Sequence, residues 1–124
     1  MANSVWIKWG SAMMFLAIAL GAFAAHGLKS RLSESMLAAF EAGVRYQVYH
    51  ALALFIVAWL ADRNPGNLVF WAGTFFLIGI LLFSGSLYAL SLTGIRGLGA
   101  ITPLGGLSFL TGWAILFLTS CRTH

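Results

Sequence analysis

Four long stretches of this chain carry almost no charge, and they constrain the fold more than any other feature. They cover about residues 5–25, 46–61, 68–92 and 103–120. The hydrocarbon core of a bilayer is about 30 Å thick, so a crossing helix needs roughly 20 apolar residues. The sequence therefore predicts an all-α integral membrane protein. We expect a four-helix bundle that forms one transmembrane domain over residues 1–124.

Composition supports this interpretation. Of the 124 residues, 60% are hydrophobic and 8% are charged, whereas soluble domains carry about 25% charged residues. A chain this short cannot hide so much apolar surface inside itself. The net charge of +4 is spread along the chain rather than clustered, so we expect no nucleic-acid binding. Membrane lipid is the expected partner.

The first stretch allows an alternative. Lys8, the apolar run after it and the AFA at 22–24 also resemble a signal peptide with a cleavage site. Trp6 and Trp9 favour a permanent anchor, because tryptophan is enriched where a spanning helix meets the membrane surface. The near balance of cations leaves the orientation open: Lys8, Arg63 and Arg122 lie on one side, and Lys29, Arg31 and Arg96 on the other.

The segment between the first two stretches has a helical pattern of its own. Ser33 is a plausible N-cap, and Leu37, Phe40 and Val44 follow at helical spacing. This pattern predicts an amphipathic interfacial segment between helices 1 and 2, either separate from the second span or continuous with it.

The second span begins with the polar sequence YQVYH at 46–50. Residues 46–61 alone make a helix of roughly 24 Å, which is shorter than the membrane core. The tyrosines, Gln47 and His50 are therefore needed for the crossing, and they must lie within or at the edge of one leaflet. Gln47 and His50 share one helix face, so we expect that face to point into the bundle.

Alternating spans place further polar residues in the same half of the membrane. Polar groups at membrane depth are costly and indicate a functional site, although each could instead bond its own backbone or anchor the interface. The candidate polar, ligand-binding cluster is His26, Glu41, Arg45, Tyr46, Gln47, His50, Ser84, Ser86, Tyr88 and Arg96.

Four motifs in order resemble a known bacterial family. GAFAAHGL (21–28), YQVYHALAL (46–54), FSGSLYALSLTG (83–94) and ITPLGGLSFLTGW (101–113) are similar to domain-of-unknown-function family 423, the YgdD and YwdK type, which is also similar to transmembrane protein 256 of eukaryotes. Ala24 stands where glycine is common in that family. The resemblance implies a four-span, multi-pass protein of the bacterial inner (cytoplasmic) membrane, but no substrate.

The residues favour a non-catalytic protein. We expect it to bind lipid, another membrane protein or a second copy of itself through the polar cluster. A small transporter or channel is the alternative, although residues 5–25 lack the membrane-embedded carboxylate of small multidrug exporters. His26 and His50 are predicted on the same side of the membrane, so a haem with two histidine ligands is a further alternative. No catalytic residue, metal site or cofactor is expected, and the single Cys121 cannot form an internal disulfide.

Overall fold

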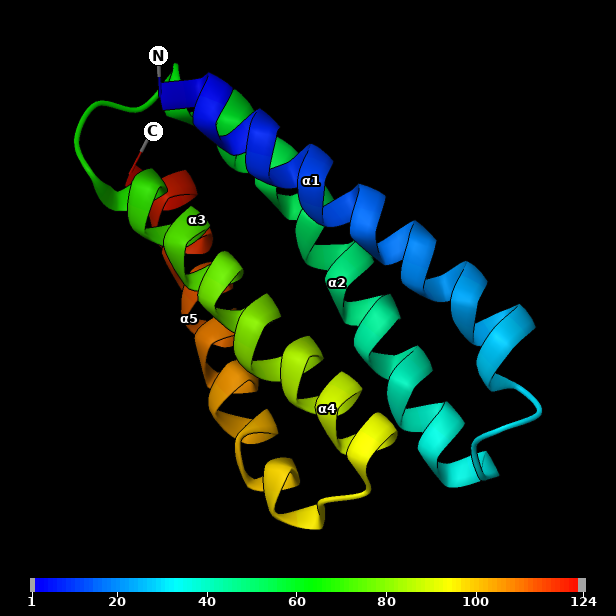
Figure 1. Cartoon of the computed structure of the whole chain (residues 1–124). Coiled ribbons are helices and arrows are strands. Elements are labelled where there is room, and N and C mark those ends of the chain that lie inside the picture. Colours follow the sequence, from blue (N-terminus) through cyan, green and yellow to red (C-terminus); the bar gives the residue numbers. More distant parts are fainter. Residues whose placement is uncertain (1, 123–124) are drawn as a thin grey trace.

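The computed structural model describes residues 2–122, and the side chains of residues 4–122 (Figure 1). The first helix, α1, spans Ala2–Phe23 and continues into a π-helical turn, Ala24–Leu28. The other helices are α2 (Glu34–Ala61), α3 (Leu68–Gly79), α4 (Gly85–Thr93) and α5 (Thr102–Arg122). A second π-helical turn, Ile80–Ser84, joins α3 to α4, and a 3₁₀ turn, Arg96–Ala100, precedes α5.

Four segments are long and apolar enough to cross a membrane. They are Ser4–Leu28, Glu34–Ala61, Leu68–Thr93 and Arg96–Arg122. The prediction of an all-α chain with four helices of membrane-spanning length is confirmed.

Helix α2 joins the segment after Ser33 to the second apolar stretch. It begins at Glu34, and the predicted cap is present: the Ser33 hydroxyl accepts a 3.2 Å hydrogen bond from the Met36 N–H. The helix then runs unbroken to Ala61, because the sequence contains no proline or turn signal after Ser33 that would stop it. Within the described chain, the residues expected to form a separate or continuous interfacial segment are the first part of α2, and their place at the membrane surface stays a prediction.

Glycines in the left-handed conformation close two of the connections. Gly66 has φ 94° in the turn between α2 and α3. Gly94 has φ 73° and ends α4, where its N–H donates to the Leu90 carbonyl at 2.8 Å. This left-handed cap is a common way to end a helix, because glycine adopts it without steric cost.

The helices run up and down, with both described ends of the chain at the same end of the bundle (Figure 1). Helix α1 packs mainly along α2, and α5 packs mainly along α3 and the turn after it. Helix α2 also contacts α3 and α4, so it is the central element that joins the two pairs. The ends of α1 and α4 lie at one end of the bundle, as four alternating spans require.

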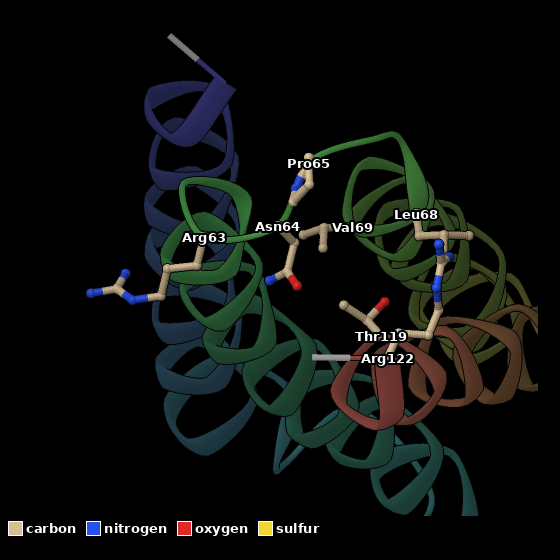
Figure 2. A pocket seen from close by; sticks show the side chains of 7 residues that line it. All are labelled: Arg63, Asn64, Pro65, Leu68, Val69, Thr119 and Arg122. Atoms are coloured by element: carbon tan, nitrogen blue, oxygen red, sulfur yellow. The ribbon is translucent and has the colours of Figure 1, made fainter. Parts of the chain in front are cut away.

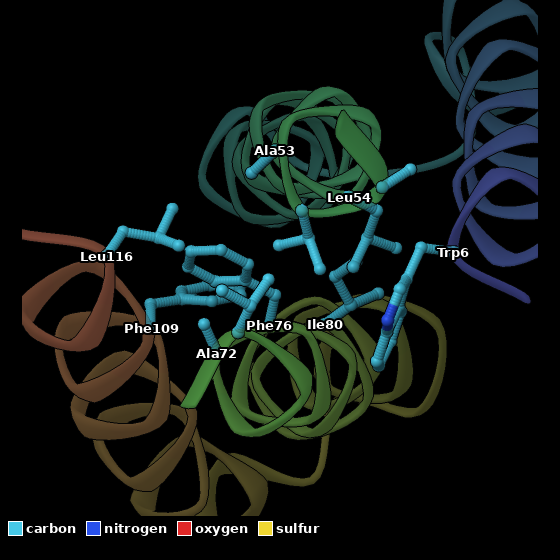
Figure 3. Packing of buried hydrophobic residues seen from close by; sticks show 11 residues of the cluster. Trp6, Ala53, Leu54, Ala72, Phe76, Ile80, Phe109 and Leu116 are labelled. Carbon is cyan, nitrogen blue, oxygen red and sulfur yellow. The ribbon is translucent and has the colours of Figure 1, made fainter. Parts of the chain in front are cut away.

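The core lies where α2, α3 and α5 meet (Figure 3). Leu54, Val57 and Phe76 are fully buried there, and Trp6 reaches this cluster from α1. Because Trp6 packs into the core, α1 is an integral part of the bundle.

Glycines make room for aromatic rings at the helix contacts. A methyl group added at Gly112 of α5 would come within 2.6 Å of the Phe76 ring, and one added at Gly73 of α3 would come equally close to Trp6. Gly79 faces Phe109 in the same way. Small residues let membrane helices approach closely, and here an aromatic ring of a neighbouring helix packs against each of these three glycines.

The outer surface is apolar. Phe15, Ile18 and Leu81 are more than half exposed, as are Leu110 and Phe117 of α5. Apolar side chains exposed along four long helices fit a lipid environment, where their contact with the solvent carries no hydrophobic cost.

Candidate functional site

The structure divides the predicted cluster into an inner and an outer set. Ser84 is fully buried, and Gln47, His50 and Ser86 are buried, while Tyr88 is half-buried. We call these five residues the inner set. The outer residues are exposed: His26, Glu41, Arg45, Tyr46 and Arg96.

Gln47 joins three helices close to the midpoint of α2. Its amide Nε2 donates a 2.8 Å hydrogen bond to the Met13 carbonyl of α1. Its Oε1 accepts a 2.6 Å hydrogen bond from the Tyr88 hydroxyl of α4. Buried polar groups in a membrane need such partners, because lipid offers none. Gln47 therefore connects α1, α2 and α4 through one side chain.

Ser84 connects the π-helical turn Ile80–Ser84 to α2 through a hydrogen bond. Its hydroxyl donates a 2.6 Å hydrogen bond to the Gly43 carbonyl. Gly43 also lies against the Tyr88 ring, and a methyl group there would come within 2.8 Å of it. The missing side chain at Gly43 thus lets α4 approach close enough for both polar contacts.

His50 links α2 to α5. Its Nδ1 lies 2.8 Å from the Tyr46 carbonyl, and its Nε2 lies 3.0 Å from the indole Nε1 of Trp113. The indole N–H can only donate, so Nε2 of His50 must accept, and the ring is neutral with its proton on Nδ1. The imidazole also stacks on Phe109, with 3.5 Å between ring centroids and 6° between ring planes.

Ser86 holds the start of α5. Its hydroxyl lies 2.5 Å from that of Thr102, and it also donates to the Phe83 carbonyl at 2.9 Å. The polar contacts of the inner set therefore tie α2, α4 and α5 to their neighbours inside the protein.

The outer residues are not gathered into one pocket. Tyr46 is 38% exposed, and Tyr49 beside it is 51% exposed. Their rings meet edge to face at 5.5 Å. Glu41 and Arg45 lie on the exposed side of α2.

His26 and Arg96 lie away from the inner set. His26 is exposed in the π-helical turn after α1, and Arg96 is exposed in the 3₁₀ turn before α5. Both nitrogens of His50 are engaged within the bundle, so a haem ligand at His50 would have to displace the Trp113 bond. Among residues 4–122 there is no group of three or more His, Cys, Asp or Glu side chains placed to hold a metal ion.

The partners of the inner set that sequence reasoning missed include the Met13 and Gly43 carbonyls, Phe109 and Trp113. A backbone acceptor leaves no mark in a sequence. Trp113 did leave one, because it lies in the middle of the fourth apolar stretch. Tryptophan anchors are enriched at membrane surfaces, so a central tryptophan indicates an internal partner for its N–H.

Comparison with known sequences gives the family. The profile described as "Protein of unknown function (DUF423)" matches residues 20–106. The chain is 47% identical over 119 residues to the UPF0382 membrane protein YwdK of Bacillus subtilis, covering 95% of this chain and 97% of YwdK. The chain belongs to the DUF423 (UPF0382) membrane protein family.

Other members of the UPF0382 family match over most of their length. A UPF0382 membrane protein of Staphylococcus haemolyticus is 43% identical over 118 residues, covering 95% of this chain and 96% of the relative. The UPF0382 inner membrane protein YgdD of Escherichia coli K12 is 38% identical over 108 residues, covering 87% and 82%. The chain is thus an inner-membrane protein with four candidate spans. No solved structure matches it.

The part matched by the DUF423 profile contains all ten predicted residues, from His26 to Arg96. Met13, Phe109 and Trp113, which complete the contacts of Gln47 and His50, lie outside it.

Proposed function

We propose that this UPF0382 protein is a non-catalytic binding protein of the membrane, and that the face of α2 around Tyr46 and Tyr49 binds a transmembrane helix of a second copy or of another membrane protein. One observation carries the proposal. Tyr46 and Tyr49 expose their side chains side by side close to the midpoint of α2, and among residues 4–122 neither hydroxyl has a hydrogen-bond partner.

The cost of such hydroxyls favours a protein partner over lipid. In the hydrocarbon region an unsatisfied polar group costs several kcal/mol, and acyl chains accept no hydrogen bond. Tyrosine can instead reach a carbonyl or a polar side chain of a neighbouring helix. The inner set cannot supply this partner, because its own polar atoms already bond to one another and to the backbone.

The first part of α2 extends this face. Glu34, Glu41 and Arg45 are exposed, and their long charged side chains can extend toward water at the membrane surface. A partner helix lying on Tyr46 and Tyr49 would meet these charges at one end. The partner is a second copy or another membrane protein, and the experiment below separates these.

Transport receives less support from the packing. Leu54, Phe76 and Phe109 fill the space between α2, α3 and α5, and the cavities lined by polar side chains lie at one end of the bundle. Each of the three acidic residues of the chain, Glu34, Glu41 and Asp62, is exposed. The bundle therefore offers no buried carboxylate of the kind a proton-coupled exporter uses.

Site-specific photo-crosslinking in native membranes tests the proposal. We expect a photoreactive phenylalanine at Tyr49 to form a discrete protein adduct, and one at Ile18, which is 65% exposed on α1, to form none. Two differently tagged copies distinguish a second copy from a different protein. Lipid adducts alone at both positions would contradict the proposal.

A second experiment keeps both tyrosines in place, because a photoreactive residue at Tyr49 removes one of the hydroxyls under test. With the photoreactive residue at Leu52, which is 51% exposed on α2 one turn from Tyr49, the Tyr46→Phe/Tyr49→Phe change should reduce the adduct about tenfold, because it removes both donors. An unchanged adduct would show that the hydroxyls do not take part.

A further inference from the structure

Two adjoining cavities lie at the end of the bundle opposite His26 and Arg96, where the α2–α3 turn meets the end of α5 (Figure 2). Each has a volume of about 340 Å³. Arg63, Asn64 and Thr119 line both, so the two cavities are direct neighbours. We call them the polar cavity and the apolar cavity.

Thr119 is the unusual residue of the polar cavity. It is 5% exposed, and its hydroxyl oxygen is buried without a hydrogen-bond partner in the described part of the chain. Thr111, two turns earlier in α5, bonds instead to the carbonyl four residues before it, at 2.8 Å. Figure 2 shows the Thr119 hydroxyl turned toward the space between Asn64, Val69 and Leu68. A buried hydroxyl without a protein partner is free to bond a molecule that enters the cavity.

The polar cavity is positive. Arg122 lines it from the last turn of α5 and extends along its rim beside Leu68 (Figure 2). Neither cavity is lined by an acidic residue within the described chain, and Asp62 borders a separate neighbouring cavity. Arg63 is already held, because it donates to the Trp59 carbonyl at 3.0 Å and lies 4.2 Å from the Trp59 ring centroid. Arg122 is therefore the cation available to an anion.

The start of α3 forms another wall. Leu68 and Val69, the first residues of this helix, line the polar cavity. The preceding Asn67 makes no side-chain capping bond, so the first N–H groups of the helix are left for another acceptor. Helix N-termini attract anions for this reason.

The apolar cavity continues the site toward the bundle interior along Leu60, Leu116 and the Trp59 ring. Trp59 and Trp71 are each about half exposed at this end. Exposed tryptophans mark the level of the lipid headgroups. A polar, positive cavity at headgroup level that opens into an apolar one has the amphipathic shape of a phospholipid.

We propose that these cavities bind one anionic phospholipid, with its phosphate beside Arg122 and Thr119 and the start of an acyl chain along Leu60 and Leu116. This site is separate from the helix-binding face at Tyr46 and Tyr49, and each can fail without the other.

Native mass spectrometry of the full chain in detergent tests the site. We offer phosphatidylglycerol and phosphatidylcholine with identical chains, and we expect the phosphatidylglycerol adduct to predominate. Thr119→Val and Arg122→Gln should each weaken it about tenfold, because each removes a hydrogen bond to a charged group. Thr119→Ser keeps the hydroxyl and should retain binding. Arg96→Gln, an equal loss of charge at the other end, should leave binding unchanged.

Other results would overturn the proposal. Equal retention of the two lipids, or equal losses in Arg122→Gln and Arg96→Gln, would show unspecific adhesion. Displacement of the lipid by inorganic phosphate at millimolar concentration would assign the site to a soluble anion. Thr119→Val could fail to fold, which its melting temperature would show. Lipid binding by Arg122→Gln then tests the proposal alone, because Arg122 is exposed at the end of α5 and its loss should leave the fold intact.

Discussion

The indole N–H of Trp113 donates a 3.0 Å hydrogen bond to Nε2 of His50. This bond joins α2 to α5. The His50 ring also stacks on Phe109, which lies on α5 one turn before Trp113. The Trp113 bond also determines the state of the histidine, because an accepting Nε2 carries no proton. The remaining proton must sit on Nδ1, where it is donated to the Tyr46 carbonyl at 2.8 Å.

Nitrogen NMR of the membrane-embedded protein should therefore find His50 as the neutral Nδ1–H tautomer. His26, which is exposed, provides a second imidazole signal for comparison within the same spectrum. In Trp113→Phe the donor to Nε2 is gone, so the Nε2 resonance of His50 should shift, while the Tyr46 carbonyl keeps the proton on Nδ1. A protonated Nε2 in the unchanged protein would contradict the hydrogen-bond pattern.

The Tyr88–Gln47 bond should contribute measurably to stability. We expect Tyr88→Phe to lower the free energy of unfolding by about 0.6 kcal/mol and at most about 1.7 kcal/mol, the range for hydrogen bonds between membrane helices. Tyr49→Phe removes an exposed hydroxyl and should change the purified protein little. Denaturation in mixed micelles measures both. A double-mutant cycle with Gln47→Leu should give a coupling energy of the same size.

Glycine packing should distinguish two positions on α5. Gly112→Ala forces a methyl group to within 2.6 Å of the Phe76 ring, and we expect a loss of about 1–3 kcal/mol from overpacking. Gly106→Ala meets nothing within 4 Å and should be neutral or up to about 1 kcal/mol more stable, because alanine favours the helix. Thermal unfolding in detergent measures both variants. Equal effects would show that the α3–α5 contact is looser than described.

Topology can be read by labelling single cysteines with an impermeant maleimide. In a Cys121→Ser background, cysteines at Ser30 and Gly97 should report the same side of the membrane, and cysteines at Asn67 and the native position 121 the opposite side. Insertion in both orientations would label all four partly, but the members of each pair would still agree. Disagreement between Ser30 and Gly97 would show that the helices do not alternate across the membrane.

Much of the fold follows from the sequence alone. Apolar length, Pro65 and Gly66, the Ser33 cap and the glycine-rich turn after Thr93 indicate four helices and their connections. The Ser33 cap marks the start of α2, but the sequence left open whether this capped segment continues into the second apolar stretch. Backbone hydrogen bonds continue wherever no residue breaks them, so the helix extends to Glu34 through polar residues.

The sequence by itself determined that this is a membrane protein and that four of its segments are long and apolar enough to span a bilayer, since both depend on the length and polarity of single segments. Only the tertiary structure decided how the polar residues are used. It separated Gln47 and His50, which are bonded inside the bundle, from Tyr46 and Arg45, which are exposed. It also brought Thr119 and Arg122 to the turn after α2. Hydrogen-bond partners depend on which helices are neighbours and how they are rotated, and no single segment of the sequence contains that information.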